Sequence, residues 1–298
     1  MQSKVELAKV RDFGEIINDT FLFLKQNIKP LLKYFFIFCG IFVIAGVISA
    51  SMYQLKVTNT MNSISNGTYN NMEYKPSFFS FIGPELFMTS TFAFLSVITI
   101  EVTILSYIAL YKEKDKAVPT TEEMWGYIKY YYLKILGSSI LLHLLLVIGF
   151  VFCIIPGLYL APIFALVLPI MIIENTSFSY AFNRCFFLIK ENWWATFGVM
   201  VVVWIIFSVC RGIIVLPTSI LNIISLITHP NKAVLSVPGA VITAGVQQLS
   251  LVFLMIPIVA LSLCYFNLTE SKDGTSLMDK ISKLGTTTPD TDLPAEEY

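Results

Sequence analysis

Six long apolar stretches alternate with short polar ones along the chain. A helix that crosses a bilayer needs roughly 20 mostly apolar residues, so the pattern predicts an all-α membrane protein with six transmembrane helices. The predicted spans are residues 31–53, 86–110, 133–155, 158–173, 195–216 and 241–266. The fourth span is short, with Pro156 and Gly157 at one edge and Pro169 at the other. These residues predict a tilted or broken helix.

The polar segments on one side of the spans have a helical pattern of their own. In residues 13–25, 120–132 and 177–190, apolar residues recur at helical spacing opposite polar ones. Thr120 or Thr121 is a plausible N-cap of the second segment, and Ser177 of the third. We therefore predict about three amphipathic helices that lie at the cytoplasmic interface, each leading into a hairpin of two spans.

Two of these segments end in similar sequences, FLKQN at 23–27 and LIKEN at 188–192. The similarity favours a unit of one interfacial helix plus one hairpin, used three times. The alternative is that any amphipathic helix next to a membrane has this pattern.

The positive charges predict the orientation of the spans. All but four of the 20 lysines and arginines fall on the side of the N-terminal segment. The exceptions are Lys56, Lys75, Arg211 and Lys232, and Arg211 is expected near the outer end of the fifth span. Positive charge is enriched in cytoplasmic loops, so both termini are predicted to be cytoplasmic. The chain then divides into an N-terminal amphipathic segment (1–30), a membrane domain (31–268) and a disordered cytoplasmic tail (269–298).

Composition supports the membrane class and argues against several others. The chain is 56% hydrophobic and 13% charged, whereas a soluble domain carries about 25% charged residues. The formal net charge is zero, which gives no reason to expect a nucleic acid partner. The five cysteines form no CxxC pair, so we expect small buried hydrophobes rather than a metal site or a cofactor.

Two ionisable residues lie inside predicted spans, Glu101 in the second and His143 in the third. Such groups are costly in a bilayer and usually face a bundle interior or a wet cavity. They could form a proton or ion pathway, or they could make a structural hydrogen bond between helices.

A second group of candidates surrounds the third amphipathic segment. Glu174 and Arg184 are expected to pair and to hold that segment against the fourth span; alternatively, Arg184 and Lys190 bind a lipid phosphate. Trp193 and Trp194 are typical of an aromatic belt. The candidate interfacial or lipid-contacting residues are Glu174, Arg184, Lys190, Asn192, Trp193 and Trp194.

The stretch IPGLYL at 155–160, followed by Pro162, Pro169, Glu174 and residues 181–194, has a recognisable order. It resembles the membrane domain attached to some bacterial glycerophosphodiester phosphodiesterases, and related stand-alone multi-pass proteins. The resemblance implies a helical bundle of this topology in a bacterial inner membrane. It implies no activity, because hydrolysis in the fused proteins belongs to a separate soluble barrel domain.

We therefore expect a non-enzymatic bundle that organises lipids or partner proteins, with anionic headgroups as partners at its cytoplasmic face. The alternative is a small-solute or lipid transporter that uses Glu101 and His143. A membrane-embedded enzyme is a third possibility, but no catalytic constellation or nucleotide motif is recognisable.

Overall fold

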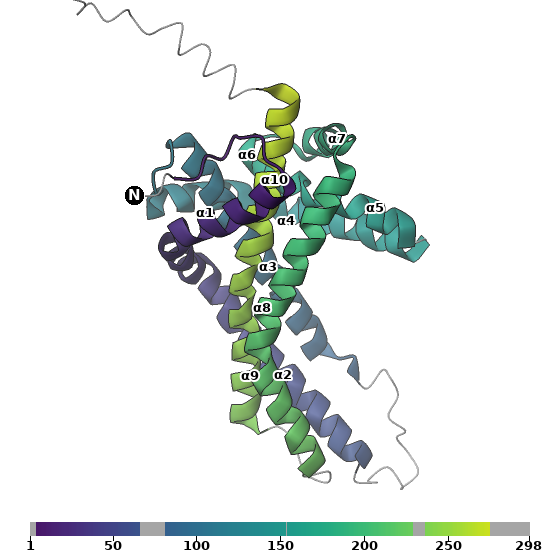
Figure 1. The fold of residues 1–298 in the computed structure, drawn as a ribbon. Helices are drawn as coiled ribbons and strands as arrows, with labels where there is room; N and C mark the ends of the chain where they lie inside the picture. Colours follow the sequence, from purple (N-terminus) through teal and green to yellow (C-terminus); the bar gives the residue numbers. More distant parts are fainter. Residues whose placement is uncertain (1–3, 66–80, 153, 229–235, 275–298) are drawn as a thin grey trace, which may run out of the picture.

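The computed structural model describes residues 4–65, 81–152, 154–228 and 236–274, and these ranges contain helices and no strand (Figure 1). Six helical runs are long and apolar enough to cross a membrane. They are Phe13–Met61, Pro84–Glu113, Thr121–Phe152, Ile154–Ile173, Trp193–Ile224 and Val237–Asp273. The predicted all-α fold with six apolar spans is confirmed, although most helices extend beyond the predicted bounds.

The first run contains an amphipathic segment and a span joined without a loop. Helix α1 (Phe13–Tyr34) starts at a capping box, in which Asp12 Oδ1 accepts from the Glu15 amide at 2.6 Å and Glu15 Oε2 accepts from the Asp12 amide at 3.2 Å. A π-helical turn (Phe35–Cys39) connects it to α2 (Gly40–Ser65). Figure 1 shows α1 and α2 running in different directions on either side of this turn. π turns are a known cause of helix bends, so the change from segment to span falls at residues 35–39.

Two long runs form the centre of the bundle. They are α3 (Pro84–Glu113) and the run of α9 (Val237–Leu249), a 3₁₀ turn (Ser250–Leu254) and α10 (Met255–Asp273), and most residues of α3 and α10 near their shared contact are buried. The N-terminal helix packs on this centre, where Tyr107 Oη of α3 donates to Asn27 Oδ1 of α1 at 2.7 Å.

Helix α8 (Trp193–Thr228) corrects one expectation. The predicted span ended at residue 216, but the helix continues for another three turns, so Arg211 lies in the middle of α8 and not at its outer end.

The third and fourth runs form a hairpin that crosses the other long helices. It contains α4 (Thr121–Phe152), α5 (Ile154–Ala165) and α6 (Val167–Ile173). In Figure 1, α4 and α5 run across the direction of α8 and of the α9–α10 run. Leu142 is the last buried residue of α4, and beyond it the two helices project from the bundle with exposed apolar side chains, such as Phe152 at 85% exposure.

The expected break in the fourth span lies at Leu166, between α5 and α6. Pro169 lacks the amide hydrogen that would bond to the Ala165 carbonyl, so the helix cannot continue unchanged through this point. The second amphipathic segment (120–132), in contrast, is not a separate helix. It is the start of α4, capped by Thr120, whose amide donates to Glu123 Oε2 at 2.7 Å.

Helix α7 (Phe178–Ile189) is separate and begins at Ser177 as expected, with the Ser177 hydroxyl accepting from the Tyr180 amide. In both 23–27 and 188–192 the first two residues are buried and the lysine is exposed. The threefold repeat itself stays a prediction.

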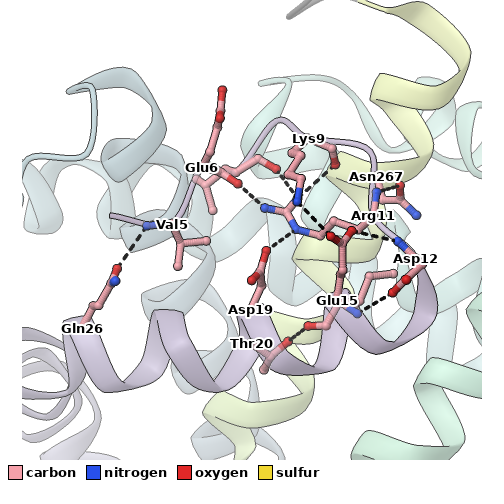
Figure 2. A network of polar contacts seen from close by, with 12 residues as sticks. Val5, Glu6, Lys9, Arg11, Asp12, Glu15, Asp19, Thr20, Gln26 and Asn267 are labelled. Carbon is pink, nitrogen blue, oxygen red and sulfur yellow. Dashed lines mark hydrogen bonds and ion pairs between the residues drawn. The ribbon is translucent and has the colours of Figure 1, made fainter. Parts of the chain in front are cut away.

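The N-terminal residues before α1 are held by a buried arginine (Figure 2). The Arg11 side chain is fully buried, and its Nε donates to Asp19 Oδ2 at 2.8 Å. Its terminal nitrogens donate to the carbonyl oxygens of Glu6, Leu7 and Lys9. The Arg11 amide also donates to Asn267 Oδ1 of α10 at 2.8 Å. This arginine therefore fastens the chain terminus to α1, and it is not available to lipid headgroups.

Candidate ligand-binding cavity

A cavity of about 360 Å³ lies where α3, α4, α5, α6, α8 and the α9–α10 run meet. Small-molecule sites in proteins occupy roughly 300–1,000 Å³, so this cavity has the volume of a small ligand. Most of its lining is aliphatic or aromatic, and Ala161 and Ala165 of α5 leave part of the space free. The cavity exists because the crossed α4–α5 hairpin meets the bundle side-on.

The structure brings both predicted intramembrane residues to this cavity. Glu101 of α3 is partly accessible within it, and His143 of α4 is exposed at its rim. Neither residue makes an ion pair with the other or with any other residue in the described ranges. The His143 ring packs edge-to-face on Phe94 at a centroid distance of 5.3 Å. The two residues thus share a cavity without forming the direct contact that a structural pair requires.

One polar residue of the cavity was missed by the sequence reasoning. Ser139 lies one turn before His143 on α4 and is 1% exposed. Its hydroxyl has no hydrogen-bond partner among the described residues, while its carbonyl contacts His143 Nδ1 at 2.7 Å. The signal in the sequence was the spacing of four residues, which places both side chains on one face of a helix.

A shallow groove on the outside of α5 and α8 leads to the cavity. It is lined by apolar side chains such as Leu158 and Phe197, together with Met200 and Trp204. Met200 and Trp204 also line the cavity, so the groove and the cavity meet at these two side chains. Trp204, which is 44% exposed, stands between them.

The second candidate group forms a cluster between α6, α7 and α10. Arg184 Nε lies 3.9 Å from Glu174 Oε1, within ion-pair range, as the sequence suggested. The closer partner is Asp273 at the end of α10, which contacts a terminal nitrogen of Arg184. Tyr265 Oη donates to Glu174 Oε1 at 2.8 Å. Residues 269–273, predicted to begin a disordered tail, are therefore part of α10 and hold α7, while residues 275–298 lie outside the described ranges.

A second ion pair reinforces the same contact. Lys272 Nζ lies 2.9 Å from Glu191 Oε2. The hydrogen bond from Lys272 keeps the pKa of the Glu191 carboxyl below its usual range. Both cations also lie over the Phe187 ring, with Arg184 at 5.4 Å and Lys272 at 5.3 Å from the ring centroid. The end of α10 thus contacts the middle of α7 through Asp273 and the segment that follows α7 through Lys272.

The remaining candidates lie at the start of α8. Trp193 Nε1 donates to the Tyr159 carbonyl of α5 at 3.0 Å and its ring stacks on Tyr159. Trp193 therefore joins α8 to α5, while Trp194 is 79% exposed. The Asn192 carbonyl accepts from the Thr196 amide and hydroxyl in the first turn of α8.

Several lysines make no ion pair in the part of the chain that the structure describes. Lys25 and Lys29 of α1, Lys129 of α4 and Lys190 after α7 are exposed, and none makes an ion pair within the described part of the chain. Others are used internally; Lys114, for example, lies 2.6 Å from Glu123.

The chain matches no protein-family model, no curated protein and no solved structure. The resemblance of residues 155–195 to the phosphodiesterase membrane domain therefore stays a prediction. Within the described ranges, no group of three or more His, Cys, Asp or Glu side chains is placed to hold a metal ion.

Proposed function

We propose that the protein is a non-enzymatic, lipid-binding membrane protein, in which the cavity between α3, α4, α5, α6, α8 and α10 takes an apolar or amphipathic molecule from the bilayer. The observation that carries the proposal is the mostly apolar cavity with Glu101, Ser139 and His143 in its wall, joined to an apolar groove on α5 and α8. Apolar walls with a few placed polar groups are typical of small-molecule sites.

The proposed setting is a bacterial inner membrane, with both termini cytoplasmic. The bias of positive charge supports this orientation. The exposed lysines Lys25, Lys29, Lys129 and Lys190 would then meet anionic headgroups, each contributing about 1 kcal/mol near the membrane surface. Trp194 would lie at the level of the headgroups.

Native mass spectrometry of the purified protein tests the proposal, because it detects lipids that remain bound. Ala161→Phe places a large side chain in the cavity wall. We expect this variant to fold and to lose the retained lipid. Ala117→Phe, in an exposed loop, is the matched control and should keep it. Equal lipid retention by both variants would show that the lipid binds elsewhere.

A second candidate function is transport, with Glu101 and His143 as proton-carrying groups. It is favoured by their presence in one cavity, with His143 at the rim. Glu101→Gln and His143→Ala should then abolish flux in proteoliposomes while the protein stays folded. Unchanged flux for every substrate tried would exclude this role.

A further inference from the structure

Glu101, Ser139 and His143 each present a hydrogen-bond acceptor in the cavity wall that has no partner among the described residues. The Glu101 carboxyl has no partner among the described residues, and neither does the buried Ser139 hydroxyl. His143 Nδ1 lies 2.7 Å from a carbonyl, which can only accept, so Nδ1 carries the proton and Nε2 of the neutral ring is an acceptor. Of the three, the Ser139 hydroxyl is buried, and a buried polar atom without a partner costs about 1–3 kcal/mol. A ligand that donates hydrogen bonds would remove this cost.

The charges of the cavity select against one large class of lipids. Glu101 and His143 are the only ionisable side chains among the described residues that line it. Phosphate and carboxylate heads are normally bound by arginine or lysine, and neither is present in this wall. Glu101 would also repel an anion.

The groove gives an apolar tail a path from the lipid to these groups. It runs over Leu158 and Phe197, and it joins the cavity at Met200 and Trp204. An apolar tail in the groove would lie next to the cavity, which has Glu101, Ser139 and His143 in its wall.

We propose that the cavity takes a single-chain amphipathic molecule whose head donates hydrogen bonds and carries no anionic group. This inference rests on the proposed function and names its ligand class. A hydroxyl head and an ammonium head share the chemistry, since both donate to Glu101, Ser139 Oγ and His143 Nε2.

Four photoactivatable probes of equal chain length test the inference on the full chain in phosphatidylcholine nanodiscs. They are a monoacylglycerol, an alkylamine, a fatty acid and a lysophosphatidic acid. We expect the monoacylglycerol and the alkylamine to crosslink to residues that line the cavity. The fatty acid and the lysophosphatidic acid should label these residues at least about tenfold less, because an anionic head cannot donate a hydrogen bond to the Glu101 carboxylate. The stronger of the first two probes identifies the head as hydroxyl or ammonium.

Glu101→Gln should reduce labelling by the alkylamine about tenfold, because it removes the carboxylate charge. Glu113→Gln is the matched control on the same helix, since Glu113 lies outside the cavity, where it accepts from Tyr127 Oη. A thermal denaturation curve confirms that both variants fold.

Equal labelling of the cavity by the fatty acid and the monoacylglycerol would overturn the head preference and leave the proposed function standing. If no probe labels the cavity, the inference and the proposed function both fail. In that case Ala161→Phe should also retain as much bound lipid as the Ala117→Phe control in native mass spectrometry.

Discussion

Replacing the buried Arg11 should destabilise the protein much more than replacing its exposed neighbour Lys9. The Arg11 side chain is fully buried and makes an ion pair with Asp19 plus hydrogen bonds to three carbonyl oxygens. Lys9 pairs with Glu15 at 3.1 Å, but both side chains are about half exposed. Removing one partner of a buried ion pair costs about 3–5 kcal/mol, because the other charge is left uncompensated. An exposed pair contributes about 0–1 kcal/mol.

The magnitude for Arg11→Ala follows from the exposure of its partner. The Asp19 side chain is 19% exposed, so water can reach the carboxylate when the guanidinium is removed. We therefore expect a loss of about 2–4 kcal/mol in the free energy of unfolding, at or just below the range for a buried pair. Arg11→Ala combined with Asp19→Asn should recover part of this loss, because no uncompensated charge remains.

Thermal denaturation in detergent, followed with a thiol-reactive dye, measures these differences. The buried free cysteines Cys39, Cys185 and Cys264 are suitable reporters in a chain in which Cys153 and the partly exposed Cys210 are replaced by serine. Limited trypsin digestion adds a local readout, because release of the segment before α1 would free its backbone to enter the protease site at Lys4. If the free energies of unfolding of Arg11→Ala and Lys9→Ala differ by less than about 0.5 kcal/mol, which is the scatter expected of surface substitutions, Arg11 does not stabilise the protein as described.

Three further predictions concern α7, the end of α10 and the α4–α5 hairpin. Arg184→Glu should lower the free energy of unfolding by about 1–2 kcal/mol in a melting experiment. Adding Asp273→Arg to the same chain should restore most of the lost stability, and no recovery would show that Asp273 is not the main partner of Arg184. Because the hydrogen bond from Lys272 lowers the pKa of Glu191, the pair should persist down to the ordinary glutamate pKa and be lost as the pH falls through the lowered value. The difference in melting temperature between the native chain and Glu191→Gln should therefore vanish at low pH, and a constant difference would contradict this. Finally, we expect Val151→Cys, in a chain without its other cysteines, to resist a membrane-impermeant maleimide added to either side. The reason is that the crossed α4–α5 hairpin keeps its apolar end in lipid. Labelling as rapid as that of an exposed loop residue would exclude this placement.

Local patterns in the sequence predicted the helices well, because they depend on residues close together in the chain. The run of apolar residues at 86–110 predicted α3. The hydroxyl side chains of Thr120 and Ser177 predicted the N-terminal ends of α4 and α7. Pro169 predicted the broken fourth span. Hydropathy could not show where a helix ends when the flanking residues are also apolar, as in α8, which continues twelve residues past its predicted end to Thr228.

The partners of charged side chains could not be predicted, because they depend on contacts between distant segments. Arg11 counts toward the positive charge of the predicted cytoplasmic side, yet its side chain binds Asp19 and the carbonyl oxygens of Glu6, Leu7 and Lys9. Arg184 was paired with Glu174, while its closer partner, Asp273, lies 89 residues away. A positive-charge count therefore does not show which cations are free to contact lipid headgroups.

The cavity shows how far a single intramembrane residue can be interpreted from sequence. The sequence placed Glu101 and His143 in adjacent spans, which left open a proton or ion pathway and a structural hydrogen bond between helices. In the structure both residues line one cavity, and neither makes an ion pair among the described residues. A carboxyl with no protein partner, in a wall that is otherwise apolar, must be neutral or must meet a donor from outside the chain. The cavity, the partner-free Ser139 hydroxyl and the groove past Trp204 all fit the second case, which is why a ligand explains this part of the molecule better than a structural hydrogen bond between helices.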